Sequence, residues 1–394
     1  MARRPSLTKT PHGAECAVDG GDGATLEHAI ARTIDEAGGW IGFDRFMALA
    51  LYTPAMGYYS RGANQIGPMP QDLPAASGSV QSAGSDFVTA PEITPLFGQV
   101  LARQVAQALQ ATNTCEVWEF GAGTGALALQ LLDALAAMGQ RLDRYTIVDL
   151  SGTLKDRQRQ TLAAYADTVH WATELPTEMH GVVVGNEVLD AMPVQLLARV
   201  RGVWHERGVV QVPHAPGFVW ADRPTALRPP LEVEGEHDYL TEIHPQAEAF
   251  VRTLAERLQR GALFFLDYGF PEAEYYHPQR HMGTVMCHRA HQADGDALAD
   301  VGCKDITAHV NFTGIALAGQ DAGLEVLGYT SQAHFLINCG LAERMQAAPL
   351  PQRVCAQKLL MEHEMGELFK AIGFVKGAAF DAIGFAQGDR SHRL

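Results

Sequence analysis

Three glycines that alternate with other residues constrain the fold of this 394-residue chain more than any other feature. The predicted strand 115–120 runs directly into Gly121, Gly123 and Gly125, and a helical pattern follows over 125–137. A strand that turns so sharply into a helix brings its backbone close to a ligand, and side chains at these positions would prevent that approach. The free N–H groups at the start of the helix add a partial positive charge. The turn therefore predicts a site for a nucleotide-type cofactor.

Strands and helices alternate after this turn, which predicts βαβ units, a parallel sheet and the α/β fold class. Alternating apolar and polar residues over 195–212 interrupt that order and predict a β-hairpin insertion. We expect strands at 115–120, 145–150, 181–185, 262–266, 324–329 and 369–375. We expect helices at 26–37, 43–51, 95–109, 125–137, 154–165, 245–258, 311–322, 333–345 and 352–363.

Composition and chain-breaking residues predict five segments. The loop within the second of them is rich in Gly, Pro and Ser. We expect a disordered tail at 1–25, an N-terminal helical segment at 26–110 with a flexible loop at 61–85, a first core half at 111–193, an insertion at 194–260, and a second core half at 261–394 with a helical cap on the substrate side at 331–365.

Charge and hydropathy exclude several classes of partner. The chain has 30 Lys and Arg against 45 Asp and Glu, a net charge of −15, which argues against general binding to nucleic acid or to anionic membranes. No apolar run reaches the roughly 18 residues that a membrane-inserted helix needs. An acidic surface suits a basic partner, such as a protein segment that bears Lys or Arg. The oligomeric state stays open, a homodimer included.

The six cysteines lie far apart without a C-x-x-C pair, which indicates a reducing compartment and a cytoplasmic protein. Glu15, Asp19 and Asp22 disfavour a mitochondrial presequence, and with it a location in the mitochondrial matrix. We expect no metal site, because the Cys and His residues of one region do not have the common zinc spacings. Those residues are His277, His281, Cys287, His288, His291 and Cys303.

Two cofactor classes fit the glycine turn. Gly121, Gly123 and Ala126 match the dinucleotide fingerprint, and Asp149 ends the next strand, where an acid binds ribose hydroxyls in both classes. Glu119 favours S-adenosylmethionine, because a carboxylate sits poorly beside a pyrophosphate but suits an ammonium and a sulfonium. The alternative for Glu119 is an acid that bonds the backbone amides of the turn.

Asn186 and Glu187 also favour S-adenosylmethionine, since they follow the predicted strand 181–185, where methyltransferases place a substrate-facing loop. The segment 86–92 carries Pro91 just before a helix, and we expect it to close the cofactor site opposite the glycine turn. Thr89, Pro91 and Glu92 are its candidate cofactor contacts. The alternative is that this segment only caps the helix that starts at 95.

Several long stretches make the sequence resemble the MidA-like methyltransferases, a family that includes the mitochondrial complex I assembly factor acting as a protein arginine methyltransferase. Two positions depart from the family pattern: Asp149 stands where Glu is usual, and Asn311 where Asp is usual, which puts a catalytic role of position 311 in doubt. The matching stretches are 86–92, 119–125, 147–151, 186–194, 266–270, 305–312, 330–333 and 364–367.

The resemblance implies a class I (Rossmann-like) methyltransferase fold, S-adenosylmethionine as the cofactor and methyl transfer to a protein arginine. For the mitochondrial member it implies symmetric dimethylation of a complex I subunit. Two other functions stay open: an NAD-dependent oxidoreductase on the same layout, and an assembly chaperone that binds S-adenosylmethionine with little turnover.

An arginine acceptor needs carboxylates, because a protonated guanidinium is a poor nucleophile that has to be oriented and to lose a proton. Glu187 and Asp190 lie three residues apart and face the same way if their loop opens a helical turn. We expect Glu187 to be the main guanidinium ligand, Asp190 the second, and His309 a proton acceptor or substrate contact. The alternative is that Asp190 caps a short helix and Glu187 binds backbone amides.

Overall fold

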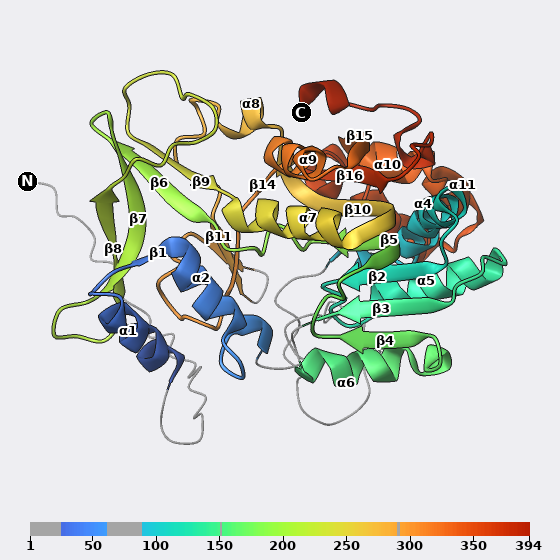
Figure 1. Cartoon of the computed structure of the whole chain (residues 1–394), viewed down its shortest axis with the longest axis horizontal. Helices are drawn as coiled ribbons and strands as arrows, with labels where there is room; N and C mark the ends of the chain where they lie inside the picture. The colour runs from blue at the N-terminus through green and yellow to red at the C-terminus, as the bar shows by residue number, and fades with distance from the viewer. Residues whose placement is uncertain (1–24, 61–88, 150–151, 290–291) are drawn as a thin grey trace, which may run out of the picture.

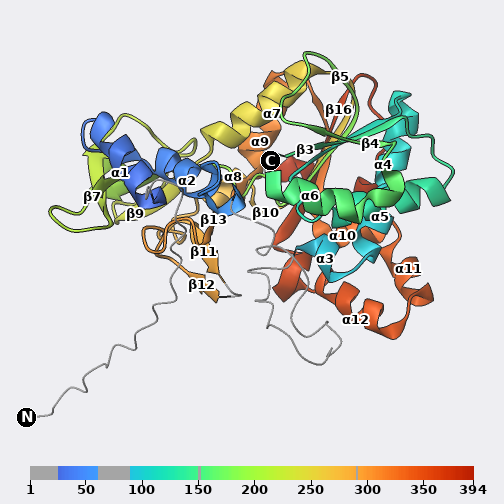
Figure 2. The same cartoon turned by 90° about the horizontal axis from the view of Figure 1, so that it is seen from below.

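The computed structural model describes residues 25–60, 89–149, 152–289 and 292–394 (Figures 1 and 2). Except for Thr25, the predicted tail and the predicted loop 61–85 lie outside these residues. An eight-stranded sheet forms the core, in the order β15-β16-β10-β5-β2-β3-β4 with β14 beside β10. Its strands are β2 (Glu116–Phe120), β3 (Arg144–Val148), β4 (Val169–Ala172), β5 (Met179–Asn186), β10 (Leu258–Phe270), β14 (Val310–Asn311), β15 (Glu325–Ser331) and β16 (Phe369–Lys376).

The sheet is mixed, whereas the sequence predicted a parallel one. The five strands β4, β3, β2, β5 and β10 are parallel, but β16 runs antiparallel to both β10 and β15. From β2 the chain moves outward through β3 to β4 and then returns to β5 on the other side of β2. Such a reversal of strand order opens a crevice at the carboxyl ends of the strands, where ligands bind in folds of this class.

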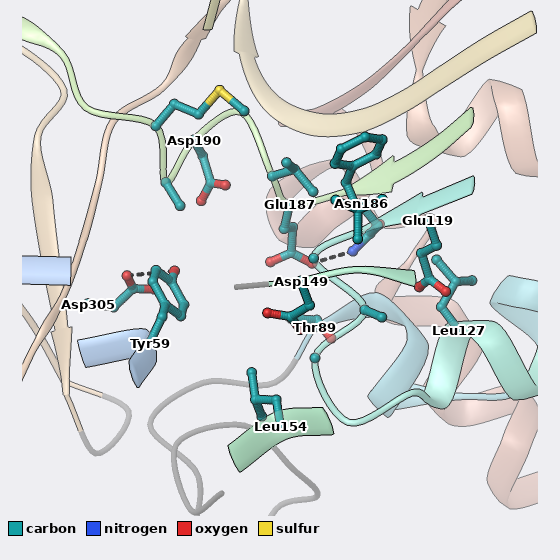
Figure 3. Close-up of a pocket in the computed structure, with 18 of the residues that line it drawn as sticks. Tyr59, Thr89, Glu119, Leu127, Asp149, Leu154, Asn186, Glu187, Asp190 and Asp305 are labelled. Atoms are coloured by element: carbon teal, nitrogen blue, oxygen red, sulfur yellow. Dashed lines mark hydrogen bonds between the residues drawn. The ribbon is translucent and has the colours of Figure 1, made fainter. Parts of the chain in front are cut away.

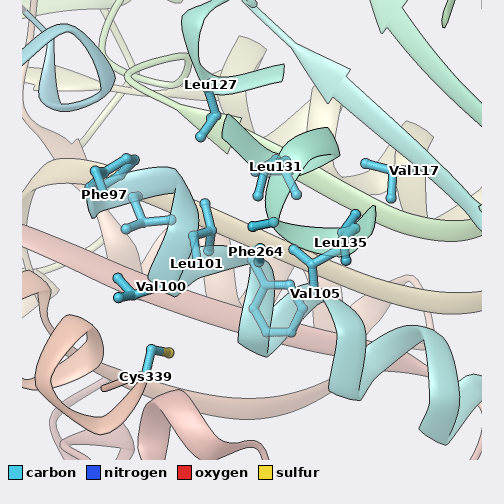
Figure 4. Close-up of a cluster of buried hydrophobic side chains, with 14 of the residues drawn as sticks. Phe97, Val100, Leu101, Val105, Val117, Leu127, Leu131, Leu135, Phe264 and Cys339 are labelled. Carbon is cyan, nitrogen blue, oxygen red and sulfur yellow. The ribbon is translucent and has the colours of Figure 1, made fainter. Parts of the chain in front are cut away.

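Helices cover both faces of the sheet (Figures 1 and 2). On one face, α5 (Ala126–Ala137) presents Leu127, Leu131 and Leu135 at four-residue spacing, so that all three share one side of the helix. They pack with α4 (Leu96–Thr112) and with Phe264 of β10 in one buried cluster (Figure 4). The other face carries α7 (Pro245–Arg257) and α9 (Phe312–Asp321). The glycine turn is thus anchored by a strand and a helix that are both held in the core.

The predicted hairpin insertion is part of a larger antiparallel sheet. β6 (Gln195–Val200) and β7 (Val203–Gln211) form the hairpin, and β8 (Phe218–Pro224) and β9 (Tyr239–Ile243) extend it. β1 (Ile41–Gly42) from the N-terminal segment also pairs with β7. Pairing between segments so far apart leaves no local sequence signal. The helices α1 (Leu26–Glu36) and α2 (Phe43–Tyr52) cover this sheet in a third hydrophobic cluster.

A small third sheet joins β11 (Met286–Arg289), β12 (Gln292–Asp294) and β13 (Asp305–Thr307), three strands that the sequence did not predict. The predicted C-terminal helices are present as α10 (Gln332–Asn338), α11 (Leu341–Ala347) and α12 (Leu350–Lys358). Phe335, Leu341 and Ala356 of these helices pack in the cluster that contains α4. Their role as a cap on the substrate side stays a prediction.

Within the described ranges, every helix is too short or too polar to cross a lipid bilayer. The segment boundaries proposed from the sequence stay a prediction.

We expect Gly181→Ala to lower the free energy of unfolding by about 3 kcal/mol or more, through a strained backbone and a steric clash. Gly181 in β5 has a φ of 118°, and a Cβ would lie 2.1 Å from the carbonyl oxygen of Glu116 in β2. Gly139→Ala is the matched control, because its φ is 66° but nothing lies within 4 Å of an added Cβ. It should cost only about 1 kcal/mol. Equal losses in denaturant unfolding would contradict the close approach of β2 and β5.

Candidate functional site

A cavity of about 620 Å³ lies where the strand order reverses, at the carboxyl ends of β2, β3 and β5. Its volume is within the roughly 300–1,000 Å³ of small-molecule sites. Figure 3 shows the labelled side chains around this common space. The lining includes most residues predicted from the sequence: Thr89, Pro91, Glu92, Glu119, Gly121, Gly123, Asp149, Asn186, Glu187 and Asp190. Gly125 and His309 do not line it.

The glycine turn adopts the backbone that its sequence predicts. Gly121, Gly123 and Gly125 have positive φ angles of 65°, 51° and 84°, in a region that glycine adopts without steric cost. A Cβ at Gly121 would lie 3.0 Å from Cγ2 of Val188. Gly125 is the N-cap of α5, and an added Cβ would meet Gln158, not the cavity. Gly125 therefore shapes the turn, while the other two glycines border the ligand space.

Glu119 is buried at the cavity and does not bond the amides of the turn. Its Oε2 accepts a hydrogen bond of 2.5 Å from the hydroxyl of Tyr145, and its side chain is 1% exposed. Burial raises the pKa of this carboxyl to about 8, against the lowering effect of the Tyr145 hydrogen bond. A cation placed beside Glu119 would offset that cost, because it favours the ionised carboxylate.

Asp149 follows β3 and is tied to the glycine turn by a residue that the sequence did not reveal. Gln158 of α6 (Gly152–Thr161) donates from Nε2 to Asp149 Oδ2 at 2.9 Å and to the carbonyl of Gly123 at 3.0 Å. Its Oε1 accepts from the indole of Trp171 at 2.9 Å. A fully buried glutamine with both ends engaged fixes one oxygen of the acid that is expected to bind ribose.

The segment with Thr89, Pro91 and Glu92 begins α3 (Ala90–Ile93) and packs against the turn itself. Glu92 accepts a hydrogen bond from the hydroxyl of Thr124, within the turn. The carbonyl of Pro91 accepts from Gln130 of α5 at 2.8 Å. The segment was expected opposite the turn, but these contacts place it beside the turn. Its residues nevertheless line the cavity.

The loop after β5 is held by a buried carboxylate from β10. Asp267 Oδ2 accepts hydrogen bonds from the amides of Val188, Leu189 and Asp190, at 3.0, 2.8 and 3.3 Å. Glu187 has a φ of 54°, so the loop does not open the helical turn that the sequence suggested. Asp267 thus takes the role that the alternative interpretation gave to Asp190, which leaves Asp190 directed at the cavity.

Glu187 and Asp190 are two acids with raised pKa values. Glu187 Oε1 accepts from Asn186 Nδ2 at 3.0 Å and from the amide of Ala90 at 3.4 Å, while burial and the charge of Asp190 raise its pKa to about 8. Asp190 Oδ2 accepts from the hydroxyl of Tyr268 at 2.7 Å, and burial raises its pKa to about 6. Asp190 Oδ1 is buried without a hydrogen-bond partner. Each of the two acids is therefore only partly satisfied by the protein.

His309 lies behind the cavity, so the structure does not support the predicted substrate contact. Its ring packs on Tyr268 and Phe270 at centroid distances of 5.3 and 5.2 Å. Burial and the charge of Arg280 lower its pKa to about 4. The hydroxyl of Tyr268 reaches Asp190 in its place. Asn311 caps α9 by accepting from the amide of Gly314, which gives this departure from the family pattern a structural role.

The far wall of the cavity comes from elements that the sequence did not link to the site. Tyr52 of α2, Tyr59 of η1 (Tyr58–Ser60) and Asp305 of β13 line it. Figure 3 shows Tyr59 and Asp305 across the cavity from Glu187. No motif or spacing connects these three positions to the glycine turn. Among the described residues, no group of three His, Cys, Asp or Glu side chains could hold a metal ion.

These observations fit S-adenosylmethionine better than a dinucleotide. Asp149 lines the cavity just after β3, where an acid can bind ribose hydroxyls, and Glu119 supplies an acid that suits an ammonium. A pyrophosphate beside Glu119, Glu187 and Asp190 would disfavour the ionised forms of these acids still further. A cofactor that carries positive charge would favour their ionised forms instead.

Replacement of Asp149 should weaken the binding of S-adenosylhomocysteine. We expect Asp149→Ala to raise its Kd about 10- to 100-fold in calorimetric titration, the range for loss of a charge-assisted hydrogen bond. Asp156→Ala is the control, because Asp156 pairs with Arg159 on the exposed side of α6. A Kd for Asp149→Ala within twofold of the wild type would exclude the ribose role.

Glu187 should make the stability of the ligand-free protein depend on pH. Its pKa is about 8 in the folded chain and about 4.3 when unfolded. The folded state therefore binds the proton more tightly, and this stabilisation is lost as the pH rises toward and through 8. The side chain at this position cannot ionise in the variant Glu187→Gln. We therefore expect the wild-type Tm to fall more than the variant's Tm between pH 6 and pH 8.5, with a difference of about 2 °C or more between the two falls. Parallel curves for the two proteins would contradict the raised pKa, and the exposed Glu174→Gln should follow the wild type.

Comparisons with known proteins agree with the geometry of the site. Residues 100–330 match a family model described as "Putative S-adenosyl-L-methionine-dependent methyltransferase". A solved structure from Burkholderia thailandensis, bound to S-adenosyl-homocysteine, is 51% identical, covers 94% of this chain and 96% of its own, and superimposes with a TM-score of 0.87. The protein arginine methyltransferase NDUFAF7 of Danio rerio is 26% identical over 82% of this chain and 78% of its own length. The protein of the same name from Xenopus laevis is 26% identical over 89% of this chain and 84% of its own length.

The matches confirm the predicted Rossmann-like fold and the predicted cofactor, and they set the nicotinamide alternative aside. The family match spans more than half of the chain, and the Burkholderia structure matches nearly all of it. This chain belongs to the S-adenosylmethionine-dependent methyltransferases of that family.

Proposed function

We propose that this methyltransferase modifies an arginine side chain of a protein. The observation that carries the proposal is Asp190, which lines the cavity beside Glu187 and whose buried Oδ1 has no hydrogen-bond partner. A buried carboxylate oxygen without a donor is costly. A ligand that brings N–H donors and positive charge to the Asp190 carboxyl would offset this cost. The relatives from Danio rerio and Xenopus laevis bear the name of protein arginine methyltransferases.

The charge balance of the site supports a cationic acceptor. Glu187, Asp190 and Asp267 take part in none of the ion pairs among the described residues. The repulsion between them raises the pKa of Asp267 well above its usual range, after the larger effect of burial. A guanidinium between Glu187 and Asp190 would favour the ionised form of both acids. The protein thus provides negative charge that it does not neutralise itself.

The chemistry of arginine methylation gives each acid a task. Bound S-adenosylmethionine supplies an electrophilic methyl group on a sulfonium. Glu187 and Asp190 orient the guanidinium and concentrate its positive charge on the nitrogens that do not react. Because the guanidinium favours the ionised form of Glu187, this carboxylate is also suited to accept a proton. Asn186 holds Glu187 for both tasks through a hydrogen bond to Oε1.

The family resemblance extends the proposal to a particular acceptor. It makes an arginine on a subunit of respiratory complex I, dimethylated symmetrically, the first acceptor to examine. The net charge of −15 is compatible with a basic protein segment as the partner. Turnover separates this proposal from the alternative of an assembly chaperone that only binds the cofactor.

Labelling of a lysate tests the proposed activity directly. The full chain is incubated with S-adenosylmethionine labelled in its methyl group and with proteins from cells that lack the enzyme. The labelled proteins are then hydrolysed and their amino acids separated. Label in methylarginines is expected. Label in another amino acid, or no transfer of label to protein, would overturn the proposal.

Glu187→Gln should reduce kcat for methyl transfer about 100-fold, the scale for removal of one charged catalytic group. Its Kd for S-adenosylhomocysteine should change by less than threefold, because Glu187 is assigned to the acceptor. Glu174→Gln, on an exposed residue, is the matched control and should transfer methyl groups at the wild-type rate. Unchanged transfer by Glu187→Gln would remove this residue from the mechanism.

A further inference from the structure

The cavity has a second acidic wall, separate from the loop that carries Glu187 and Asp190. Asp305 is 3% exposed, and its Oδ1 accepts a hydrogen bond of 2.8 Å from the hydroxyl of Tyr59. The two residues come from different parts of the fold, β13 and η1, and both border the cavity. Figure 3 shows this pair facing the space in front of Glu187 and Asp190.

Two stacked tyrosines form the surface of this wall. The rings of Tyr52 and Tyr59 lie 5.6 Å apart with an interplanar angle of 22°. Both hydroxyls are engaged, that of Tyr52 with the carbonyl of Ala191 at 2.7 Å and that of Tyr59 with Asp305. With their hydroxyls held, the rings are fixed in place beside the carboxylates. Aromatic faces next to acids form a favourable surface for a planar cation.

The two walls act on the same space. The charge of Asp305 contributes to the raised pKa of Glu187 on the opposite wall, after burial and the charge of Asp190. The charges of both Asp305 and Asp190 raise the pKa of Tyr52, after burial. These three carboxyls therefore share one electrostatic environment. Asp190 is 5% exposed, and its buried Oδ1 has no hydrogen-bond partner.

We propose that Asp305, held by Tyr59, is a second guanidinium ligand and selects arginine over lysine as the acceptor. The inference rests on the proposed function. An arginine guanidinium is a rigid plane with five N–H donors, so its opposite edges can reach Glu187 and Asp190 on one wall and Asp305 on the other. A lysine ammonium is a compact charge that cannot contact both walls at once. In this arrangement Asp305 contacts the acceptor, and Tyr59 is a positioning residue.

The pair also explains why the N-terminal segment belongs to the active enzyme. α2 and η1 lie outside the core sheet, yet they supply Tyr52 and Tyr59 to the cavity. Phe46 of α2 packs against Phe218 of the insertion sheet with 5.6 Å between the ring centroids, and this contact holds α2 in position. The acceptor side of the site thus combines a loop of the core sheet, which carries Glu187 and Asp190, with elements outside that sheet.

The test compares Asp305→Asn and Tyr59→Phe in the full chain. The acceptor is the protein identified by the labelling experiment, used with its modified arginine intact and with that arginine replaced by lysine. For Asp305→Asn we expect a 10- to 100-fold rise in KM for the arginine acceptor and a smaller ratio of arginine to lysine methylation. For Tyr59→Phe we expect both effects to be smaller. The Kd of S-adenosylhomocysteine should stay within twofold in both variants.

The chain offers a matched control for each substitution. Tyr165 donates to Asp133 at 2.6 Å in the same kind of hydrogen bond, outside this cavity. Tyr165→Phe and Asp133→Asn should therefore leave KM and the arginine-to-lysine ratio unchanged. Asp305→Glu, which keeps the charge, should retain more of the arginine preference than Asp305→Asn. A merely structural role of the pair would alter stability without altering that ratio.

The outcomes separate this inference from the proposed function. If the wild type methylates arginine but both variants keep its KM and its preference, the Asp305–Tyr59 assignment is wrong and the arginine activity stands. If Asp305→Asn does not fold, Tyr59→Phe alone decides in the same way. If the wild-type enzyme labels a residue other than arginine, or labels no protein, the proposed function and this inference are both overturned.

Discussion

The buried carboxylate of Asp267 is the interaction on which the acceptor side of the site depends. One oxygen accepts from three consecutive amides, and in this way the end of β10 fixes the loop that follows β5. Without it, three buried N–H groups would need other partners, and the left-handed backbone at Glu187 would lose its support. Because Asp267 accepts from these amides, Asp190 does not have to cap them. The loop can therefore present two acids to the cavity because a third acid, which does not line it, supplies the hydrogen bonds.

Burial of several acids around one cavity sets the electrostatic character of the enzyme. Glu119 and Glu187 each have a pKa raised to about 8, mainly because burial penalises their ionised forms. In the empty site this is a cost to the folded state at neutral pH. A cationic cofactor at Glu119 and a cationic acceptor at Glu187 would each offset part of it. Binding of one ligand would change the affinity for the other only if both ligands stabilise the ionised form of the same carboxyl. Glu119 is close enough to Asp149 for its charge to matter, whereas Glu187 senses Asp190 and Asp305.

The sequence predicted the cofactor half of the site far better than the acceptor half. The glycine turn, Asp149 and Glu119 lie at the ends of consecutive strands, so the parallel βαβ order alone brings them together. Gln158 was not predicted, because a single glutamine in a helix does not by itself indicate a binding site. Tyr52, Tyr59 and Asp305 come from a helix, a short turn and a small sheet whose pairing is long-range, and no local pattern encodes it. His309 lies in the stretch 305–312 that resembles the family, but its ring packs on Tyr268, whose hydroxyl contacts Asp190. The helices within 331–365 could be predicted from their sequence pattern. Which side of each helix is buried could not, because it depends on packing with α4.

This division has a consequence for how specificity is built. The cofactor side is fixed by the close pairing of β2 with β5 and by a turn in which added Cβ atoms would be strained, so it tolerates little change. The wall that carries Tyr52, Tyr59 and Asp305 comes from α2, η1 and β13, which share a hydrophobic cluster with the insertion sheet. Changes in that packing can move Tyr59 and Asp305 without disturbing Gly121 or Asp149. Relatives that share the glycine turn can therefore differ in acceptor, and the acceptor of a member of this fold is better judged from the wall opposite the turn than from the turn itself.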